Sequence, residues 1–113
     1  MISKHAAPPP RPIETLSPAR GARLGPRTRF SWAPLADAQA YRLEFYPLKP
    51  DQKTPVSRKP AGGMLVLGTR HRLLLSLPAR ARLRPGAYQW RIVAIGDHGR
   101  ILGASPPVPI YVP

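Results

Sequence analysis

Hydrophobic and polar residues alternate with a period of two along several short stretches of the chain. The clearest stretch follows the dipeptide Pro85-Gly86 and places four residues on one face: Tyr88, Trp90, Ile92 and Ala94. The polar residues Gln89 and Arg91 lie between them. Alternation of aromatic and β-branched residues with polar residues, directly after a turn signal, predicts a strand that is buried on one face.

The same pattern predicts further strands at 13–16, 28–32, 41–45, 64–67, 71–77, 100–104 and 108–112, with Pro106-Pro107 interrupting the last one. In the stretch 71–77, the inward residues are Leu73, Leu75 and Leu77. We expect the centre of the core to consist of Phe30, Trp32, Tyr41, Leu43, Tyr88, Trp90 and Ile92. These strands are short and numerous, as in an all-β domain.

The content of proline and glycine supports an all-β domain. The chain has 17 prolines and nine glycines among its 113 residues. A proline inside a helix costs about 3 kcal/mol, so long helices are disfavoured and turns are favoured. We therefore expect the stretches 47–63 and 78–85 to be loops.

The N-terminal stretch differs from the rest in composition. Residues 1–12 read MISKHAAPPPRP, and consecutive prolines favour polyproline II with little sheet pairing. We predict a proline-rich tail or linker at 1–12 and one β-domain at 13–113. A proline-rich ligand for an aromatic groove is the alternative interpretation of the tail.

The order and spacing of the strand motifs resemble those of a fibronectin type III domain, in the variant found in bacterial envelope and secreted proteins. The motifs are Phe30-x-Trp32-x-Pro34, Tyr41-x-Leu43-x-Phe45, Leu83-x-Pro85-x-x-Tyr88-x-Trp90 and Gly99. The resemblance implies a seven-stranded immunoglobulin-like β-sandwich of two sheets. It also implies a tyrosine corner, in which the phenol of Tyr88 ties the preceding loop to the sandwich. Such modules act as spacers, adhesive units or assembly subunits, and the fold alone does not choose among these roles.

Residues that commonly carry catalysis or bind metals are dispersed along the chain. There is no cysteine, and the three histidines are His5, His71 and His98. The acidic residues are Glu14, Asp37, Glu44, Asp51 and Asp97. No nucleophile, metal-ligand spacing or calcium loop emerges from them. We therefore expect no enzyme, no cofactor and no metal site.

The net charge is the strongest anomaly of the composition. It is +13 at pH 7, with an isoelectric point near 11.6. Such a charge attracts nucleic acid, lipid head groups or acidic proteins and polymers. The alternative is a compositional bias with no function, because the arginines are scattered singly and outnumber the lysines.

The sandwich topology converts the scattered charges into one basic end. The loop after 13–16, the loop 47–63 and the loop 78–85 gather at the same end of such a sandwich. We define the basic pole, a candidate site for an anion or a partner, as Arg20, Arg23, Lys49, Lys53, Arg80, Arg82 and Arg84. The same loops also carry Arg27, Arg58 and Lys59, whereas Asp37 and Asp97 fall at the opposite end.

The outer face of the predicted strand 88–94 and its neighbour 41–45 is a second candidate surface. Its candidate partner-binding residues are Arg42, Arg91, Val93 and Ile95. Val93 and Ile95 break the polar side of the alternation, so they are either an exposed apolar patch or a minor core under the long loop or the tail. Glu44 and Arg91 are expected to form a cross-strand pair.

These observations lead to a non-catalytic module that contacts protein partners or the cell envelope within a larger assembly. The alternative is a protein that binds nucleic acid or another anionic polymer through the basic pole. A carbohydrate-binding module would need exposed aromatic residues, for which Tyr46 and Tyr111 are the candidates. No stretch approaches the ~20 apolar residues of a transmembrane segment. The location is therefore cytoplasmic, or periplasmic or extracellular if a targeting segment has been removed.

Overall fold

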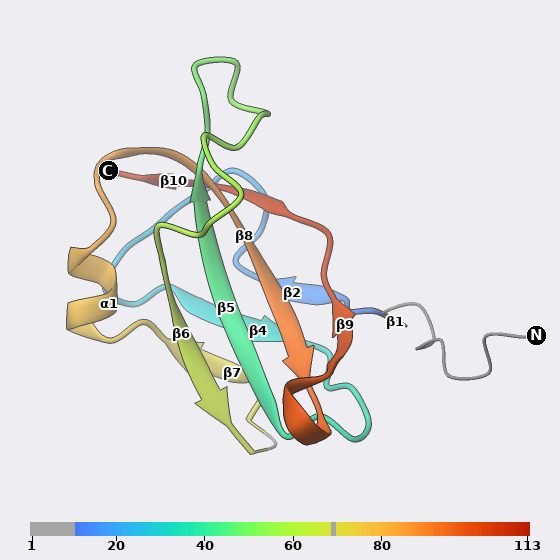
Figure 1. Ribbon diagram of the computed structural model, residues 1–113. Helices are drawn as coiled ribbons and strands as arrows, with labels where there is room; N and C mark the ends of the chain where they lie inside the picture. The colour runs from blue at the N-terminus through green and yellow to red at the C-terminus, as the bar shows by residue number, and fades with distance from the viewer. Residues whose placement is uncertain (1–10, 69) are drawn as a thin grey trace, which may run out of the picture.

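The computed structural model describes residues 11–68 and 70–113, which form two β-sheets packed face to face (Figure 1). The elements are β1 (Arg11–Pro12), β2 (Thr15–Ser17), β3 (Ala22–Arg23), β4 (Arg29–Trp32), β5 (Ala40–Pro47), β6 (Gly62–Leu67), β7 (Arg72–Leu74), α1 (Leu77–Ala81), β8 (Gly86–Ile95), the 3-10 helix η1 (Asp97–Gly99), β9 (Ile101–Ala104) and β10 (Val108–Val112). The small sheet has the order β2-β4-β7. The prediction of an all-β fold with two sheets is confirmed.

The large sheet is built around β8. This strand pairs antiparallel with β5 along one side and with both β9 and β10 along the other. At the edges, β6 pairs with β5, while the short strands β1 and β3 run parallel to β9 and β10. Within the described residues, no helix has the length and apolar content that a membrane crossing requires.

Aromatic side chains from both sheets meet in the core. The ring centroid of Phe30 in β4 lies 5.0 Å from that of Trp90 in β8 and 5.5 Å from that of Phe45 in β5. Both pairs are edge-to-face, a favourable arrangement for aromatic rings. The structure buries all seven residues expected at the centre, none more than 4% exposed: Phe30, Trp32, Tyr41, Leu43, Tyr88, Trp90 and Ile92.

Both tryptophans lie entirely inside this core. Trp32 comes from the small sheet and Trp90 from the large sheet, and each is 0% exposed. Among the described residues, neither indole N–H has a hydrogen-bond partner. The two side chains therefore contribute through packing alone.

The double proline Pro106-Pro107 separates two strands, β9 and β10, that pair with β8 one after the other. Between them, Ser105 is buried, and its backbone N–H donates to the carbonyl of Ile92 at 2.8 Å. Its hydroxyl accepts from the N–H of Ile92 at 2.9 Å. Because Ser105 serves both backbone groups of Ile92, β8 remains paired across the interruption.

The prediction of one strand over 71–77 with Leu77 inward is wrong. The strand β7 ends at Leu74, and Leu77 is 69% exposed at the start of α1. The hydroxyl of Ser76 accepts from the N–H of Ala79 at 3.2 Å, and a proline follows in the first turn. A serine cap and a proline at this position start a helix, and here they overrule the alternation of leucines.

Sheet pairing begins two residues earlier than expected. The predicted tail includes Arg11 and Pro12, yet these residues pair with Gly103 and Ala104 of β9. A parallel edge pairing needs only some of the backbone groups of each residue, so Pro12 is tolerated there. Residues 1–10 of the predicted tail lie outside the described residues.

Candidate functional site

Sheet register brings two loops of the basic pole to one end of the large sheet. Tyr111 of β10 pairs with Arg23 of β3 on one side and with Ala87 of β8 on the other. The carbonyl of Ala87 accepts from the N–H of Leu48 at 2.9 Å. One row across the sheet therefore joins Arg23 to the residue before Lys49, over about 15 Å at ordinary strand spacing. Figure 1 shows the connection between α1 and β8 at the same end.

Arg23 also contacts the aromatic ring beside it. Its guanidinium carbon lies 5.3 Å from the ring centroid of Tyr111, which is 42% exposed. A cation above an aromatic face is attracted by the ring quadrupole. Arg20, three residues after the end of β2, is exposed in the connection that leads into β3. These two arginines form one flank of the basic pole.

The other flank follows α1. Arg80 lies half-buried in the last turn of the helix, and Arg82 and Arg84 are exposed after it. Arg82 and Arg84 line a hollow of about 290 Å³ together with Pro47 and Leu48 at the base of the long loop. The basic side chains of the connection between α1 and β8 thus border one depression with the base of the long loop.

The tip of the long loop carries Lys49 and Lys53, both exposed. Asp51 lies between them, and its carboxylate accepts hydrogen bonds from the N–H groups of Lys53 and Thr54 and from the Thr54 hydroxyl. These bonds, the side-chain bond from Thr54 foremost, lower the pKa of Asp51 to about 2. Asp51 therefore stays ionised and organises the loop tip, which presents the two lysines.

Acidic groups are found at the opposite end, as expected. Asp37 lies in the turn between β4 and β5, and Asp97 begins η1. The side-chain amide of Gln39 donates a hydrogen bond to the carboxylate of Asp97. The charges of the described residues are thus distributed unequally between the two ends of the sandwich.

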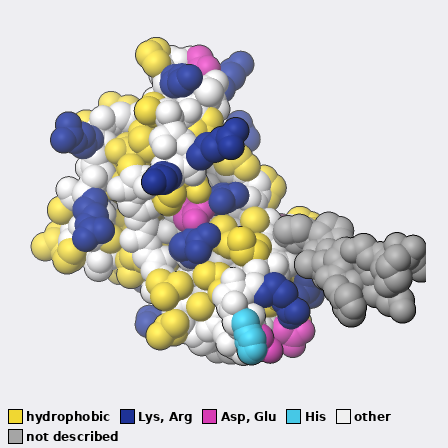
Figure 2. Space-filling model, viewed as in Figure 1, with side chains coloured by type: hydrophobic (Ala, Val, Ile, Leu, Met, Phe, Trp, Pro, Cys, Tyr) yellow, Lys and Arg dark blue, Asp and Glu magenta, His cyan; other side chains and the backbone are white. Residues whose placement is uncertain are grey.

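A second charged group lies on the outer face of the large sheet, at the pair of residues predicted from the sequence. Glu44 and Arg91 are directly opposite each other on β5 and β8, with Arg91 Nε 2.7 Å from Glu44 Oε1. Arg42 Nε lies 2.6 Å from the other oxygen, Oε2. Figure 2 shows this face, where basic side chains surround an acidic one over the centre of the sheet.

Glu44 is buried, at 3% exposure, beneath these arginines. The hydroxyl of Tyr46 donates to its Oε1 at 2.6 Å. Burial alone would raise the pKa of Glu44, but hydrogen bonds from Tyr46, Arg91 and Arg42 outweigh it and hold the pKa below its ordinary value of 4.5. Burial and the bond to Glu44 raise the pKa of Tyr46, so the phenol stays protonated as the donor.

Val93 does not present an apolar patch, because it is only 1% exposed. In the register of the sheet it lies between Arg42 on β5 and Ala104 on β9. Ile95 is half-buried at the end of β8. The proposed partner surface is therefore reduced to Arg42 and Arg91, whose side chains are 43% and 39% exposed.

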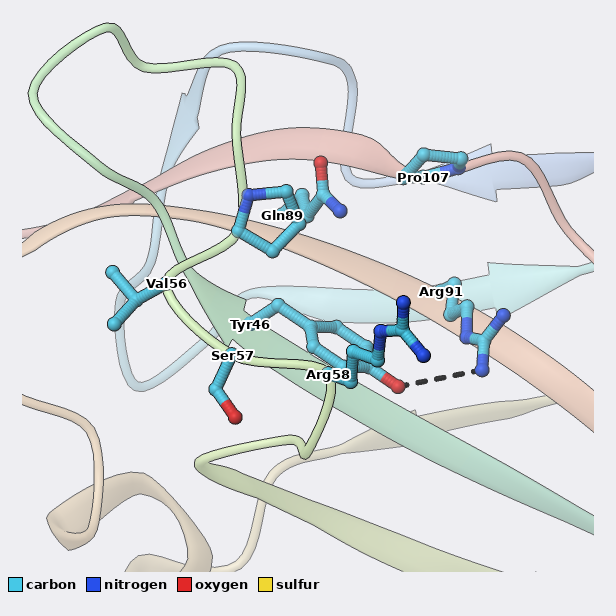
Figure 3. A pocket seen from close by; sticks show the side chains of 8 residues that line it. Tyr46, Val56, Ser57, Arg58, Gln89, Arg91 and Pro107 are labelled. Atoms are coloured by element: carbon cyan, nitrogen blue, oxygen red, sulfur yellow. Dashed lines mark hydrogen bonds between the residues drawn. The ribbon is translucent and has the colours of Figure 1, made fainter.

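Arg58 of the long loop lies on the face of the large sheet and not at the basic end, where the sequence predicts it. The loop folds back along the sheet, and the side chain of Arg58 lies beside Tyr46 and Arg91 (Figure 3). Tyr46 is 7% exposed, so it offers no aromatic platform for a sugar. Sequence reasoning missed this arrangement, because no local signal encodes the path of a loop of this length.

The described residues contain no group of three or more histidine, cysteine or acidic side chains that could hold a metal. His71 is engaged by the backbone, with Nδ1 3.2 Å from the carbonyl oxygen of Trp32. The exposed turn residue His98 has no neighbouring carboxylate in an ion pair within the described part of the chain.

Comparisons with known proteins bear on the fold. No family model matches the chain, and no curated protein matches it in sequence. The structure is similar to the fibronectin(III)-like modules of CbhA from Clostridium thermocellum, with a TM-score of 0.50 and 20% sequence identity. The similarity covers 88% of this chain and 93% of the other. The hydroxyl of Tyr88 accepts a hydrogen bond from the N–H of Arg84, as expected for a tyrosine corner of this fold.

Proposed function

We propose that this fibronectin type III-like β-sandwich is a non-catalytic module that binds an anionic partner through the basic pole, as part of a larger assembly. In this proposal the partner is an acidic protein or an anionic component of the cell envelope. We further infer a seven-stranded sandwich, in which β1, β2 and β3 are segments of one strand and β9 and β10 are the halves of another.

One observation carries the proposal: the register that places Arg23 and the base of the long loop in a single row of the large sheet. Arg82 and Arg84 border the same end through the hollow they share with Pro47 and Leu48. Exposed cations gathered on one end raise the local concentration of anions and speed their association. If the same charges were spread evenly over the surface, they would not direct an anionic partner to one end of the sandwich.

The two acidic residues with a lowered pKa, Glu44 and Asp51, have structural roles that fit a binding module. Glu44 holds two arginines and Asp51 holds a loop tip. Both carboxylate oxygens of each residue have hydrogen-bond partners within the fold. A module of this kind acts by presenting side chains on a rigid scaffold.

The test compares two triple variants with the same change of net charge. The variant R80E/R82E/R84E alters the basic pole, whereas R70E/R72E/R100E alters exposed arginines outside it. Arg42 is unsuitable as a control because it binds the buried Glu44. We measure binding to immobilised polyglutamate, to vesicles rich in anionic lipid and to short duplex DNA, at low and high salt.

We expect the unmodified protein to bind polyglutamate or the vesicles in a salt-sensitive manner. The pole variant should lose this binding, and the control variant should retain most of it. Equal losses in the two variants would show that net charge alone acts and would overturn the proposal. Binding confined to DNA, with a steep salt dependence, would overturn it in favour of a nucleic-acid-binding protein.

A further inference from the structure

A hollow on the outer face of the large sheet lies between the returning limb of the long loop and β8. Its volume is about 420 Å³, within the range of small-ligand sites. Its floor includes Tyr46 and Gln89, and Arg58 and Arg91 stand at its side. Figure 3 shows the side chains of these two arginines converging beside the Tyr46 ring.

Positive charge exceeds negative charge around this hollow. Two arginines, Arg58 and Arg91, line the hollow, and no carboxylate does. Arg91 is paired with Glu44, which lies outside the lining and also holds Arg42. Glu44 occupies the Nε of both Arg42 and Arg91. Arg58 forms no ion pair and no side-chain hydrogen bond with any described residue. The hollow thus lacks one anion for the cations that border it.

The polar groups at the hollow are suited to a planar oxyanion. Arg91 uses its Nε for Glu44 and one terminal nitrogen for Tyr46 at 3.3 Å, which leaves further N–H groups. The guanidinium of Arg58 and the side-chain amide of Gln89 add donors. Guanidinium groups present N–H donors in a planar fork that matches the two oxygens of a carboxylate.

The remaining walls are apolar. Val56, which is 58% exposed, Pro55 and Pro107 line the hollow. The backbone holds this rim in place, since the N–H of Val56 donates to the carbonyl of Pro47 at 2.8 Å and Pro55 forms a bridge with Leu48. A ligand that carries an apolar group next to its negative charge would cover Val56, which inorganic phosphate would leave exposed.

We propose that this hollow binds a carboxylate of a peptide, with Arg58 and Arg91 as its cationic partners and Val56 against an apolar side chain next to it. The site lies on the sheet face and contains no residue of the basic pole. It is therefore independent of the function proposed above. It would give the module a point of specific recognition beside an electrostatic one.

The probe is N-acetylleucine, which combines a carboxylate with an aliphatic group. Its carboxamide, N-acetylleucinamide, is the neutral counterpart, and glucuronate and inorganic phosphate represent other sources of negative charge. Titrations are followed by the NMR signals of the Gln89 side-chain amide and the arginine Nε–H groups. We expect saturable shifts with N-acetylleucine and none with N-acetylleucinamide.

Variants separate the site from general charge effects. Arg58→Ala should weaken N-acetylleucine binding about tenfold, the loss expected for a charged hydrogen bond. Lys59→Ala removes the adjacent exposed charge and should leave binding unchanged. Arg58 is exposed, and its side chain forms no hydrogen bond or ion pair with a described residue, so Arg58→Ala should fold as the unmodified protein does, which circular dichroism checks.

Three results would overturn the proposal. They are equal shifts with the carboxylate and its amide, equal affinity of Arg58→Ala and the unmodified protein, and glucuronate or phosphate binding as tightly as N-acetylleucine. The triple variant R80E/R82E/R84E keeps the hollow intact. If it loses polyglutamate but retains N-acetylleucine, the two proposals are shown to stand or fall separately.

Discussion

The phenol oxygen of Tyr88 lies 3.0 Å from the backbone nitrogen of Arg84 and accepts its hydrogen bond. The two residues are four positions apart in sequence, so the bond closes the connection that leads from α1 into β8. Tyr88 is 4% exposed, and its ring belongs to the core. One side chain thus joins the packing of the sandwich to the position of two arginines of the basic pole.

Replacing Tyr88 with phenylalanine should remove this bond and keep the ring. We expect the free energy of unfolding to fall by about 1 kcal/mol, the usual net value of a single hydrogen bond. Urea denaturation followed by circular dichroism measures it. Tyr111→Phe is the control, because that ring is exposed and its hydroxyl has no hydrogen bond within the described residues. Equal effects of the two substitutions would contradict a special role of the Tyr88 hydroxyl.

The charged group around Glu44 predicts a pH dependence of stability. Its pKa is lower in the folded protein than its ordinary value of 4.5, because hydrogen bonds from Tyr46, Arg91 and Arg42 outweigh burial. The stabilisation is therefore complete above about pH 4.5 and is lost as the pH falls through the folded pKa. Glu44→Gln should cost about 1–3 kcal/mol at pH 7 and much less at pH 3.

The stability of Glu44→Gln must be compared with that of the unmodified protein at each pH, because Asp51 also titrates at acidic pH and changes the stability of both proteins. Its pKa is lowered from 3.8 to about 2, so it adds its own pH dependence below pH 4. Asp51→Asn should leave the contribution of Glu44 intact. A difference between Glu44→Gln and the unmodified protein that stays constant from pH 7 to pH 3 would refute the stabilising role of the ionised carboxylate.

Gly63 is required by the close pairing of β6 with β5. A Cβ atom at this position would lie 2.0 Å from the backbone oxygen of Leu43, and a backbone atom cannot move aside cheaply. Gly63→Ala should therefore lower the free energy of unfolding by roughly 2–3 kcal/mol, the upper part of the usual range. Gly25→Ala is the matched control, since its Cβ would meet only Thr28 Oγ1 at 3.7 Å. Thermal unfolding of both variants tests the difference.

The edge strand β6 alternates between a buried and an exposed face. Val66 is 6% exposed, whereas its neighbours Leu65 and Leu67 are 57% and 69% exposed. Leu67→Lys should change the free energy of unfolding by less than about 0.5 kcal/mol and reduce self-association, because a lysine on an edge strand opposes pairing with another chain. Light scattering against protein concentration measures the association. Val66→Lys should instead unfold the protein, and similar behaviour of the two variants would refute the assigned faces.

Local patterns sufficed for the strands and for contacts within them. The alternation at Tyr88, Trp90 and Ile92 predicted a strand with one buried face, and the spacing of Glu44 and Arg91 predicted their pairing, which the sheet register bears out. Such features depend on periodicity and on direct neighbours in a ladder, both of which are written in consecutive residues.

Local patterns did not predict features in which two signals compete for the same residues, or features that depend on the path of a loop. The cap at Ser76 was present in the sequence, but the alternating leucines that follow His71 favoured a longer strand. The sequence around Val93 left its burial open, and the position of Arg58 depends on the path of the long loop across the sheet. These are long-range relationships, which a residue's sequence neighbours do not specify.

The placement of the two tryptophans gives the protein an internal optical reporter. Both indoles are withdrawn from water, one in each sheet, so the folded protein should emit at short wavelength and shift to the red on unfolding. Because Trp90 packs against Phe30 while Trp32 packs against Tyr41, each indole reports on a different part of the core. Single replacements of either indole by phenylalanine would then reveal whether the two sheets separate together or one after the other.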